Sequence, residues 1–262
     1  MMGISNTVKH LLIINVLVWI GALSIGQYGE VFNNLFALHF PKNDLFQIWQ
    51  IITHMFMHAT YVTTANGPTI YIQHILFNMF ALWMFGTAVE RAIGQKKFIF
   101  FYISAGLGAA LLQLGYYYFK FYSGMDALTA SGLDQTTIMN TLNEGKYNTG
   151  WNTILGSDGL QSFLGVFNSS MVGASGAIMG VLVAFGMLFP ESKLMLIFLP
   201  IPIKAKYFIP AIIALDLISA ITGQSFFSPG NTAYIAHIGG ALTGFIIMYF
   251  WKKDQFDKYR WN

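Results

Sequence analysis

The architecture of this chain depends on two short stretches, VGASGA at residues 172–177 and AHIGGALTG at residues 236–244. Each lies in an apolar, glycine-rich segment long enough to cross a lipid bilayer. Each also carries one reactive side chain near its start, Ser175 in the first and His237 in the second. Ionisable side chains are costly inside lipid and usually functional where they occur. Because a hydroxyl beside an imidazole is the minimum equipment for nucleophilic acyl transfer, what matters is whether these two side chains meet.

The composition is that of a membrane protein. Of the 262 residues, 55% are hydrophobic and only 10% are charged, whereas an average soluble domain carries about 25% charged residues. The net charge of +3 is too small to indicate nucleic-acid binding. The absence of cysteine excludes disulfides, thiolate catalysis and cysteine-ligated metals. The first apolar run lacks a clear small-residue cleavage site, so we interpret it as a retained span.

Six segments have the apolar character of membrane-spanning helices, each of which needs about 20 mainly apolar residues. They are residues 10–29, 74–93, 98–119, 171–189, 207–223 and 233–251. The run at 194–203 is shorter and contains two prolines, so we expect an interfacial or re-entrant connection. The predicted fold class is an all-α polytopic membrane protein, a six-helix bundle with a long interfacial loop at 28–73. Residues 1–262 are predicted to form a single membrane domain.

The charge distribution orients these spans. Lys42, Lys120 and Lys146 fall on one side of the predicted membrane, and the other eleven of the 14 lysines and arginines fall on the opposite side. The positive-inside rule then places both termini in the cytoplasm. The connection at residues 120–170 is polar, and we expect it to be an external, partly mobile insertion.

This orientation places three polar side chains at one depth. Spans two, four and six run from outside to inside, so His74, Ser175 and His237 all lie about one turn below the outer surface. Small residues allow transmembrane helices to approach closely. Spans four and six each carry glycines four residues apart, Gly176 with Gly180 and Gly240 with Gly244. Packing of these glycine faces would bring the serine hydroxyl within hydrogen-bonding reach of the imidazole.

Span two supplies a further pair of polar groups. His74 and Asn78 are four residues apart and share one helical face. Both can donate hydrogen bonds to a developing oxyanion, and the first-turn N–H of Ser175 could join them. Structural hydrogen bonding between helices is the rival interpretation, and the two roles can coexist.

At these residues the chain resembles the rhomboid family of intramembrane serine proteases. The matching motifs are HILFN at 74–78, Gly86 followed by VER at 89–91, GASG at 173–176, and AHIGGALTG at 236–244. With the segment that begins at Trp49, the resemblance covers nearly the whole chain outside residues 120–170. Gln50 follows that tryptophan where many members have arginine, so an ion pair or phosphate anchor there is absent.

The resemblance implies roles for these residues. Ser175 would be the nucleophile and His237 its general base, with His74, Asn78 and the Ser175 N–H binding the oxyanion. It implies no metal and no other cofactor, a lipid bilayer as surroundings, and single-span membrane proteins as substrates, cut near the extracytoplasmic face. The loop at 224–232 and the fifth span would correspond to the family's gating region. The six-span form with short cytoplasmic ends fits a bacterial inner membrane, and the sequence defines no oligomeric state.

Other polar residues have plainer explanations. His54 and His58 have the spacing of a metal-binding pair on a helix, but no further ligand is evident, so we favour an interfacial structural role. Asp216 lies in the middle of span five and could carry protons, act as a third catalytic member, or hydrogen-bond to a neighbouring helix. Because it should lie deeper than the catalytic pair, we favour the structural role. Glu90 and Arg91 are interpreted as a helix-end anchor.

Two other functions stay open from sequence. One is a non-catalytic rhomboid-like protein that binds transmembrane helices and assists their folding or turnover. Such relatives typically lack the serine or the histidine, and this chain keeps both. The other is a small transporter with Asp216 as its proton site, although the spans show no convincing inverted repeat.

Overall fold

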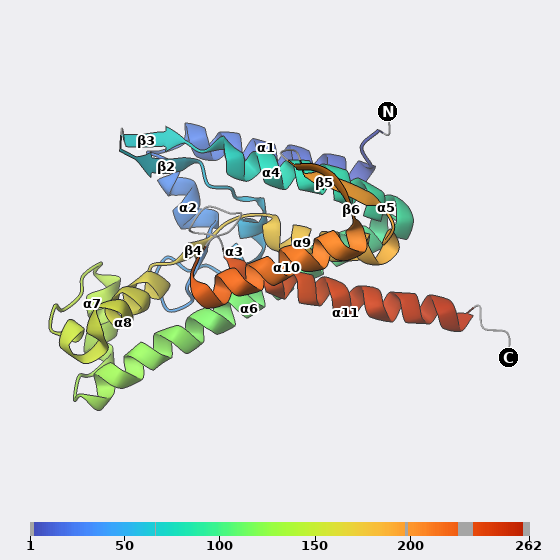
Figure 1. The fold of residues 1–262 in the computed structure, drawn as a ribbon. Helices are drawn as coiled ribbons and strands as arrows, with labels where there is room; N and C mark the ends of the chain where they lie inside the picture. Colours follow the sequence, from blue (N-terminus) through green and yellow to red (C-terminus); the bar gives the residue numbers. More distant parts are fainter. Residues whose placement is uncertain (1–2, 66, 197–198, 225–232, 259–262) are drawn as a thin grey trace.

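The computed structural model describes residues 3–65, 67–196, 199–224 and 233–258. Its body is a bundle of long helices, with the two termini at one end and helices α7 and α8 at the other (Figure 1). The long helices are α1 (Asn6–Ser24), α6 (Gln95–Ala130), α9 (Ser175–Leu188), α10 (Ala205–Thr222) and α11 (Tyr234–Lys258). A further helix is continuous over 72–93 and consists of α4 (Ile72–Ala81), the π-helical turn η2 (Leu82–Gly86) and α5 (Thr87–Ile93).

Five of the described helices are long and apolar enough to cross a membrane. They are α1, the continuous helix at 72–93, α6, α10 and the Tyr234–Lys252 part of α11. The chain is therefore a membrane protein. The expected span at 171–189 is shorter than predicted, because α9 has only 14 residues.

Helix α9 starts late because the chain before it is extended. Strand β4 (Ser170–Met171) pairs antiparallel with β1 (Leu38–His39), and the helix begins only at Ser175. Fourteen residues give a helix of about 21 Å, against the roughly 30 Å hydrocarbon core of a bilayer. Ten consecutive residues of α9 are buried by other helices, from Gly176 to Phe185. A helix that is enclosed by protein does not have to match the lipid thickness.

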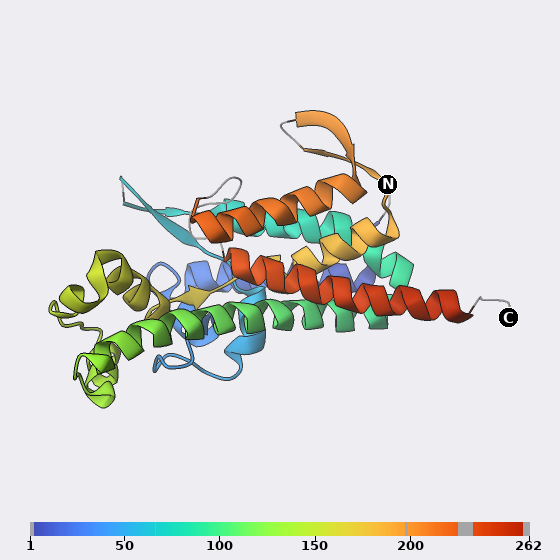
Figure 2. The ribbon, with the colours of Figure 1, turned by 60° about the horizontal axis from the view of Figure 1, so that its bottom comes forward.

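Glycines bring α9 and α11 into close contact, as the sequence predicts. A Cβ placed on Gly240 would lie 1.8 Å from the carbonyl oxygen of Gly176, and one on Gly244 would lie 2.6 Å from Cα of Gly180. Helix α11 also lies along α6 (Figure 2), where a Cβ on Gly239 would lie 2.7 Å from the carbonyl oxygen of Gly108. Only glycine permits such backbone proximity, so the predicted packing of spans four and six is confirmed.

The segment at 120–170, which we expect to be an external and partly mobile insertion, is built from helices. Helix α6 continues to Ala130, and α7 (Gln135–Asn143) and α8 (Trp151–Phe167) fold back against it. The three helices enclose a second hydrophobic core. Its buried members from these helices are Phe121, Met125, Leu128, Ile138, Leu142, Trp151, Leu160, Phe163, Val166 and Phe167. These residues recur at helical spacing, and the polar residues between them conceal the pattern.

The loop between α1 and α4 is ordered around a buried glutamine. It contains α2 (Glu30–Phe36), α3 (Gln50–Thr53), the 3₁₀ turn η1 (His54–Phe56) and a hairpin of β2 (Tyr61–Thr64) with β3 (Gly67–Ile70). The fully buried side chain of Gln50 makes four hydrogen bonds to main-chain groups of this loop, at Asn34, His39, Leu45 and Gln47. A neutral side chain with both donors and acceptors is suited to this task, because charged arginine has no acceptor.

The connection at 194–203 is a β-hairpin at the end of the bundle where the N-terminus lies (Figure 1). Strand β5 (Lys193–Leu196) pairs with β6 (Leu199–Lys204). At its base, Glu191 forms exposed ion pairs with Lys204 (2.7 Å) and Lys206 (2.5 Å). The hydrogen bonds from these two lysines lower the pKa of Glu191 to about 2. Exposed ion pairs thus join the base of the hairpin to the start of α10.

The C-terminal end of the helix at 72–93 anchors the start of α1, which confirms the helix-end role expected for Glu90. Its carboxylate accepts hydrogen bonds from Ser5 Oγ (2.5 Å) and from the N–H groups of Thr7 and Val8 (both 3.0 Å). An acidic side chain at a helix N-terminus satisfies free amides and complements the helix dipole. Arg91 donates to the carbonyl of Gly3.

Candidate active site

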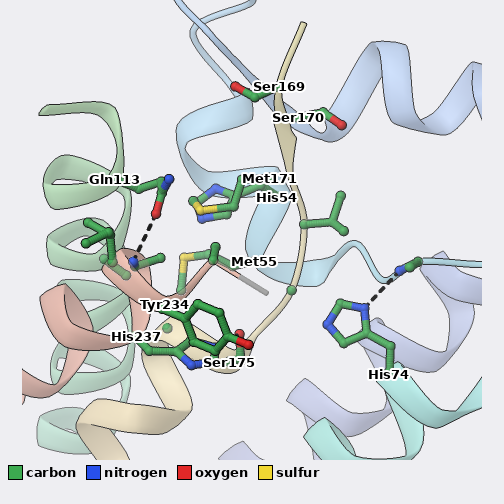
Figure 3. Close-up of a pocket in the computed structure, with 18 of the residues that line it drawn as sticks. His54, Met55, His74, Gln113, Ser169, Ser170, Met171, Ser175, Tyr234 and His237 are labelled. Carbon is green, nitrogen blue, oxygen red and sulfur yellow. Dashed lines mark hydrogen bonds between the residues drawn. The ribbon is translucent and has the colours of Figure 1, made fainter. Parts of the chain in front are cut away.

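A cavity of about 1190 Å³ opens among the helices that carry the predicted site residues. Its walls come from α4, α6, α9, α10 and α11, and from the end of α8 with the strand that follows (Figure 3). The predicted residues that line it are His74, Asn78, Ser175 and His237. Since these come from elements far apart in sequence, the fold brings all four predicted side chains to one cavity.

Ser175 is held at the entrance to α9 by the extended chain before it. Gly173 has φ +129, a conformation that side chains rarely adopt, and its N–H donates to the carbonyl of His54 (2.9 Å). A Cβ at Gly173 would lie 3.1 Å from His74 Nε2 and 3.6 Å from Ser175 Oγ. Glycine is therefore required both for the backbone turn and for the open space beside the serine.

Ser175 and His237 are in direct contact. His237 Nε2 lies 2.8 Å from Ser175 Oγ, and the histidine is the fourth residue of α11. The start of α11 is fixed from α6, because Gln113 Oε1 accepts from the N–H of Ala236 (3.1 Å; Figure 3). The hydrogen bond expected from the glycine faces is thus present.

Asp216 lies beside His237, so its expected position deeper than the catalytic pair is wrong. Its Oδ2 is 2.8 Å from His237 Nδ1, the ring nitrogen that faces away from Ser175. The two side chains are 13% and 11% exposed. The position of Asp216 within its own span could not predict this contact, because it does not show how far α10 is shifted along its axis relative to α11. The expectation that Asp216 bonds to a neighbouring helix is met, at the imidazole itself.

His74 presents a defined hydrogen-bond donor to the cavity. The main-chain N–H of Ala59 donates to His74 Nδ1 (3.2 Å; Figure 3). Because a neutral imidazole has one N–H, the proton must then reside on Nε2. Nε2 is the atom that faces Gly173 and Ser175.

Asn78 is less free than expected. Its Nδ2 donates to the carbonyl of His74 one turn earlier (2.8 Å), and its buried Oδ1 has no hydrogen-bond partner among the described residues. One N–H of the amide is therefore engaged within α4, and the other is left for a bound group. Asn78 thus makes a hydrogen bond within its own helix and also lines the cavity.

His54 and His58 are buried, in keeping with a structural role. Burial lowers the pKa of His54 to about 4, although its Nδ1 donates to the carbonyl of Gln50 (2.8 Å). Burial and the neighbouring His74 lower the pKa of His58 to about 3, and its ring packs edge-on against that of His74 (5.1 Å between centroids). Across the described part of the chain, no three His, Cys, Asp or Glu residues are grouped so as to hold a metal.

Two contributors to the site escaped the reasoning from sequence. Gln113 is 4% exposed and sets the start of α11. A single glutamine within a charge-free span is the signal that could have identified it. Ser169 and Ser170 line the cavity from the segment after α8, and no local pattern marks them (Figure 3). The gating loop expected at 224–232 lies outside the described residues except for Gln224.

Comparisons with known proteins identify the family of this chain. The rhomboid domain family matches residues 45–253. The chain is 30% identical over 172 residues to the presenilin-associated rhomboid-like protein, mitochondrial, of Rattus norvegicus. This alignment covers 65% of this chain and 32% of that protein. The chain is 25% identical over 232 residues to Rhomboid protein 1, mitochondrial, of Saccharomyces cerevisiae, covering 84% and 53%. It is 29% identical over 208 residues to rhomboid protease AarA of Providencia stuartii, covering 76% and 54%.

The matched region spans about a third of the length of the presenilin-associated relatives and about half of the other two. The family match covers most of this chain, including every predicted site residue. By this match, the chain belongs to the rhomboid family.

Proposed function

We propose that the chain is an intramembrane serine endopeptidase that cleaves transmembrane segments of other membrane proteins near the extracytoplasmic face. The observation that carries the proposal is the 2.8 Å contact between Ser175 Oγ and His237 Nε2 beside a large cavity. A nucleophile with its base in hydrogen-bonding reach is the signature of covalent catalysis. The relative from Providencia stuartii, which is named as a protease, supports the same assignment.

In the proposed reaction, Ser175 Oγ attacks the carbonyl carbon of the scissile peptide while its proton passes to His237 Nε2. Collapse of the tetrahedral intermediate breaks the C–N bond, and His237 gives this proton to the leaving amine. Water then attacks the acyl-enzyme ester, with His237 again taking the proton, and the carboxylic acid leaves from a restored serine. The steps use only side chains and water, so we propose that no metal and no other cofactor is required.

The oxyanion of the intermediate is proposed to bind His74 Nε2–H, the second N–H of Asn78 and the N–H of Ser175. The assigned proton on His74 Nε2 supports this role. The Ser175 N–H belongs to the first turn of α9 and has no intrahelical acceptor. Preorganised donors of this kind stabilise charge that develops only in the transition state.

The proposed substrate is a single-span membrane protein whose helix unwinds at the cavity. Helical carbonyl groups are engaged in backbone hydrogen bonds, so a peptide bond has to leave the helix before a nucleophile can reach it. The cavity is lined by residues at the starts of α4, α9 and α11 and at the end of α10. These helix ends point toward the end of the bundle that carries α7 and α8 (Figure 1). We propose six membrane crossings, with enclosed α9 as the fourth, both termini in the cytoplasm, and a bacterial inner membrane as the location.

The decisive experiment combines probe labelling with cleavage of a test transmembrane protein by the purified chain. Wild type is expected to react with a fluorophosphonate at Ser175 and to cleave the test protein. Ser175→Ala and His237→Ala are expected to lower kcat by about 10⁴-fold or more, because each removes a member of one catalytic unit. Ser24→Ala is the matched control, since that exposed hydroxyl only bonds to the carbonyl of Ile20 within α1.

Cleavage by Ser175→Ala at the wild-type rate would refute the peptidase proposal. Binding of transmembrane helices by wild type, with no product and no probe labelling, would instead establish the non-catalytic, helix-binding alternative. Proton-coupled uptake in proteoliposomes that Asp216→Asn abolishes would establish the transporter.

A further inference from the structure

We infer that Asp216 positions the catalytic base. By accepting a hydrogen bond from His237 Nδ1–H, its carboxylate fixes the imidazole in the tautomer and orientation that Ser175 requires. The inference rests on the proposed peptidase function and extends the serine–histidine pair to an array of three. Asp216 acts through His237 and does not touch the scissile bond, so it is a positioning residue.

The geometry places the three side chains in series. Ser175 Oγ and Asp216 Oδ2 each lie 2.8 Å from His237, on opposite ring nitrogens. They come from three helices, α9, α10 and α11, whose packing therefore determines the array. A carboxylate that merely joined two helices could bond to any donor, whereas this one faces the nitrogen opposite the nucleophile.

This arrangement selects the productive form of the imidazole. An ionised carboxylate only accepts hydrogen bonds, so Nδ1 must carry the proton toward Asp216. Nε2 is then an acceptor and receives the hydroxyl proton of Ser175. Without a partner on Nδ1, the His237 ring could carry its proton on Nε2 instead. Nε2 would then face Ser175 as an N–H group and could not accept the hydroxyl proton. The carboxylate therefore determines the fraction of His237 that can act.

The surroundings strengthen this interaction during the reaction. The Asp216 and His237 side chains are only 13% and 11% exposed, and electrostatic attraction is stronger where water is scarce. An imidazolium forms when His237 takes the serine proton, and the carboxylate beside it stabilises that charge. Because the imidazolium is absent before the reaction begins, its stabilisation by Asp216 should raise kcat and leave KM nearly unchanged.

The test compares Asp216→Asn and Asp216→Glu with wild type, in kcat, KM and the rate of fluorophosphonate labelling. Asparagine has the size of aspartate and can still hydrogen-bond across the helices, but it has no charge and can donate to Nδ1. We expect Asp216→Asn to lower kcat by about 10²–10⁴-fold with KM within about threefold of wild type, as loss of a tautomer-fixing carboxylate does elsewhere. Asp216→Glu keeps the acceptor and should recover at least tenfold over Asn.

The controls separate this inference from the peptidase proposal and from loss of fold. Asp158→Asn, at an exposed site on α8, should leave kcat unchanged. A wild-type kcat and labelling rate in Asp216→Asn, with Ser175→Ala inactive, would overturn the positioning role and leave the peptidase standing. If the Asp216→Asn variant did not fold, Asp216→Ala would be measured in the same way, because alanine adds no hydrogen-bond donor. A wild-type kcat in Asp216→Ala would overturn the inference. A loss of kcat of at least tenfold at constant KM would support it.

Discussion

At the scale of single residues, the site depends on where two imidazole protons reside. In His74 the proton is assigned by a main-chain group, because the N–H of Ala59 occupies Nδ1 and leaves Nε2–H facing the serine. In His237 it is assigned by Asp216 on Nδ1, which leaves Nε2 free to accept. In the proposed reaction, the same type of side chain thus serves as a donor in one place and as a base in the other.

The donor role of His74 can be measured directly. We expect His74→Ala to lower kcat by about 10²–10³-fold, because one donor to the oxyanion is lost. KM should change little, since the oxyanion forms only after binding. His10→Ala is the control, because His10 is exposed on α1 and bonds only to the carbonyl of Asn6. An unchanged kcat in His74→Ala would leave the oxyanion to the remaining donors.

At the scale of helices, the distance between α9 and α11 determines how closely Ser175 and His237 approach each other. Gly176 and Gly180 on one helix meet Gly240 and Gly244 on the other at backbone contact. Ser175 and His237 each lie within one turn before the first glycine of their helix. The helices also differ in what they face. Helix α9 is enclosed by its neighbours, whereas α10 buries only Ala205, Ile209 and Ser219 almost completely.

A single methyl group at this contact should separate the catalytic pair. In Gly240→Ala the new Cβ would overlap the carbonyl oxygen of Gly176, so α9 and α11 must move apart. We expect a loss of about 1–3 kcal/mol in stability, as for other overpacked sites, together with loss of cleavage. Gly115→Ala is the matched control, because a Cβ there meets no atom within 4 Å and alanine favours the helix. Thermal unfolding in detergent and a cleavage assay report the two effects; equal behaviour of both variants would contradict the packing argument.

At the scale of the whole molecule, the chain has two distinct ends. The termini and the β5–β6 hairpin lie at one end, and α7, α8 and the β2–β3 hairpin at the other (Figure 1). The second hydrophobic core holds α7 and α8 together at the latter end. The segment after α8 contributes Ser169 and Ser170 to the cavity. The insertion thus forms part of the cavity wall.

The proposed orientation can be tested with single cysteines, because the chain has none of its own. We expect a membrane-impermeant maleimide to label Thr149→Cys, in the exposed connection between α7 and α8, in intact cells. Lys96→Cys, exposed at the opposite end, should be labelled only after the membrane is opened, as the positive-inside rule requires. Labelling with the reverse pattern would invert the proposed topology.

Much of this arrangement could be predicted because it follows from local composition and spacing. Charge-free runs identify the spans, and glycines four residues apart identify the faces that pack. The serine and histidine beside those glycines then have to meet. The helices between Phe121 and Phe167 were not predicted, because polar residues separate the apolar ones that form their core. The fourth span was predicted too long, because the chain before Ser175 is extended and pairs as a strand.

The order of residues was thus sufficient for the membrane class, the family resemblance and the Ser175–His237 contact, since each is encoded in periodicity or in motifs along one helix. Folding in three dimensions was needed to place Asp216 against the imidazole of His237, to assign the proton of His74, and to pack α7 and α8 against α6. These features depend on the relative offset of separate helices and on main-chain groups of a distant loop. Such offsets arise from the sum of many side-chain contacts, which no single segment of the chain contains.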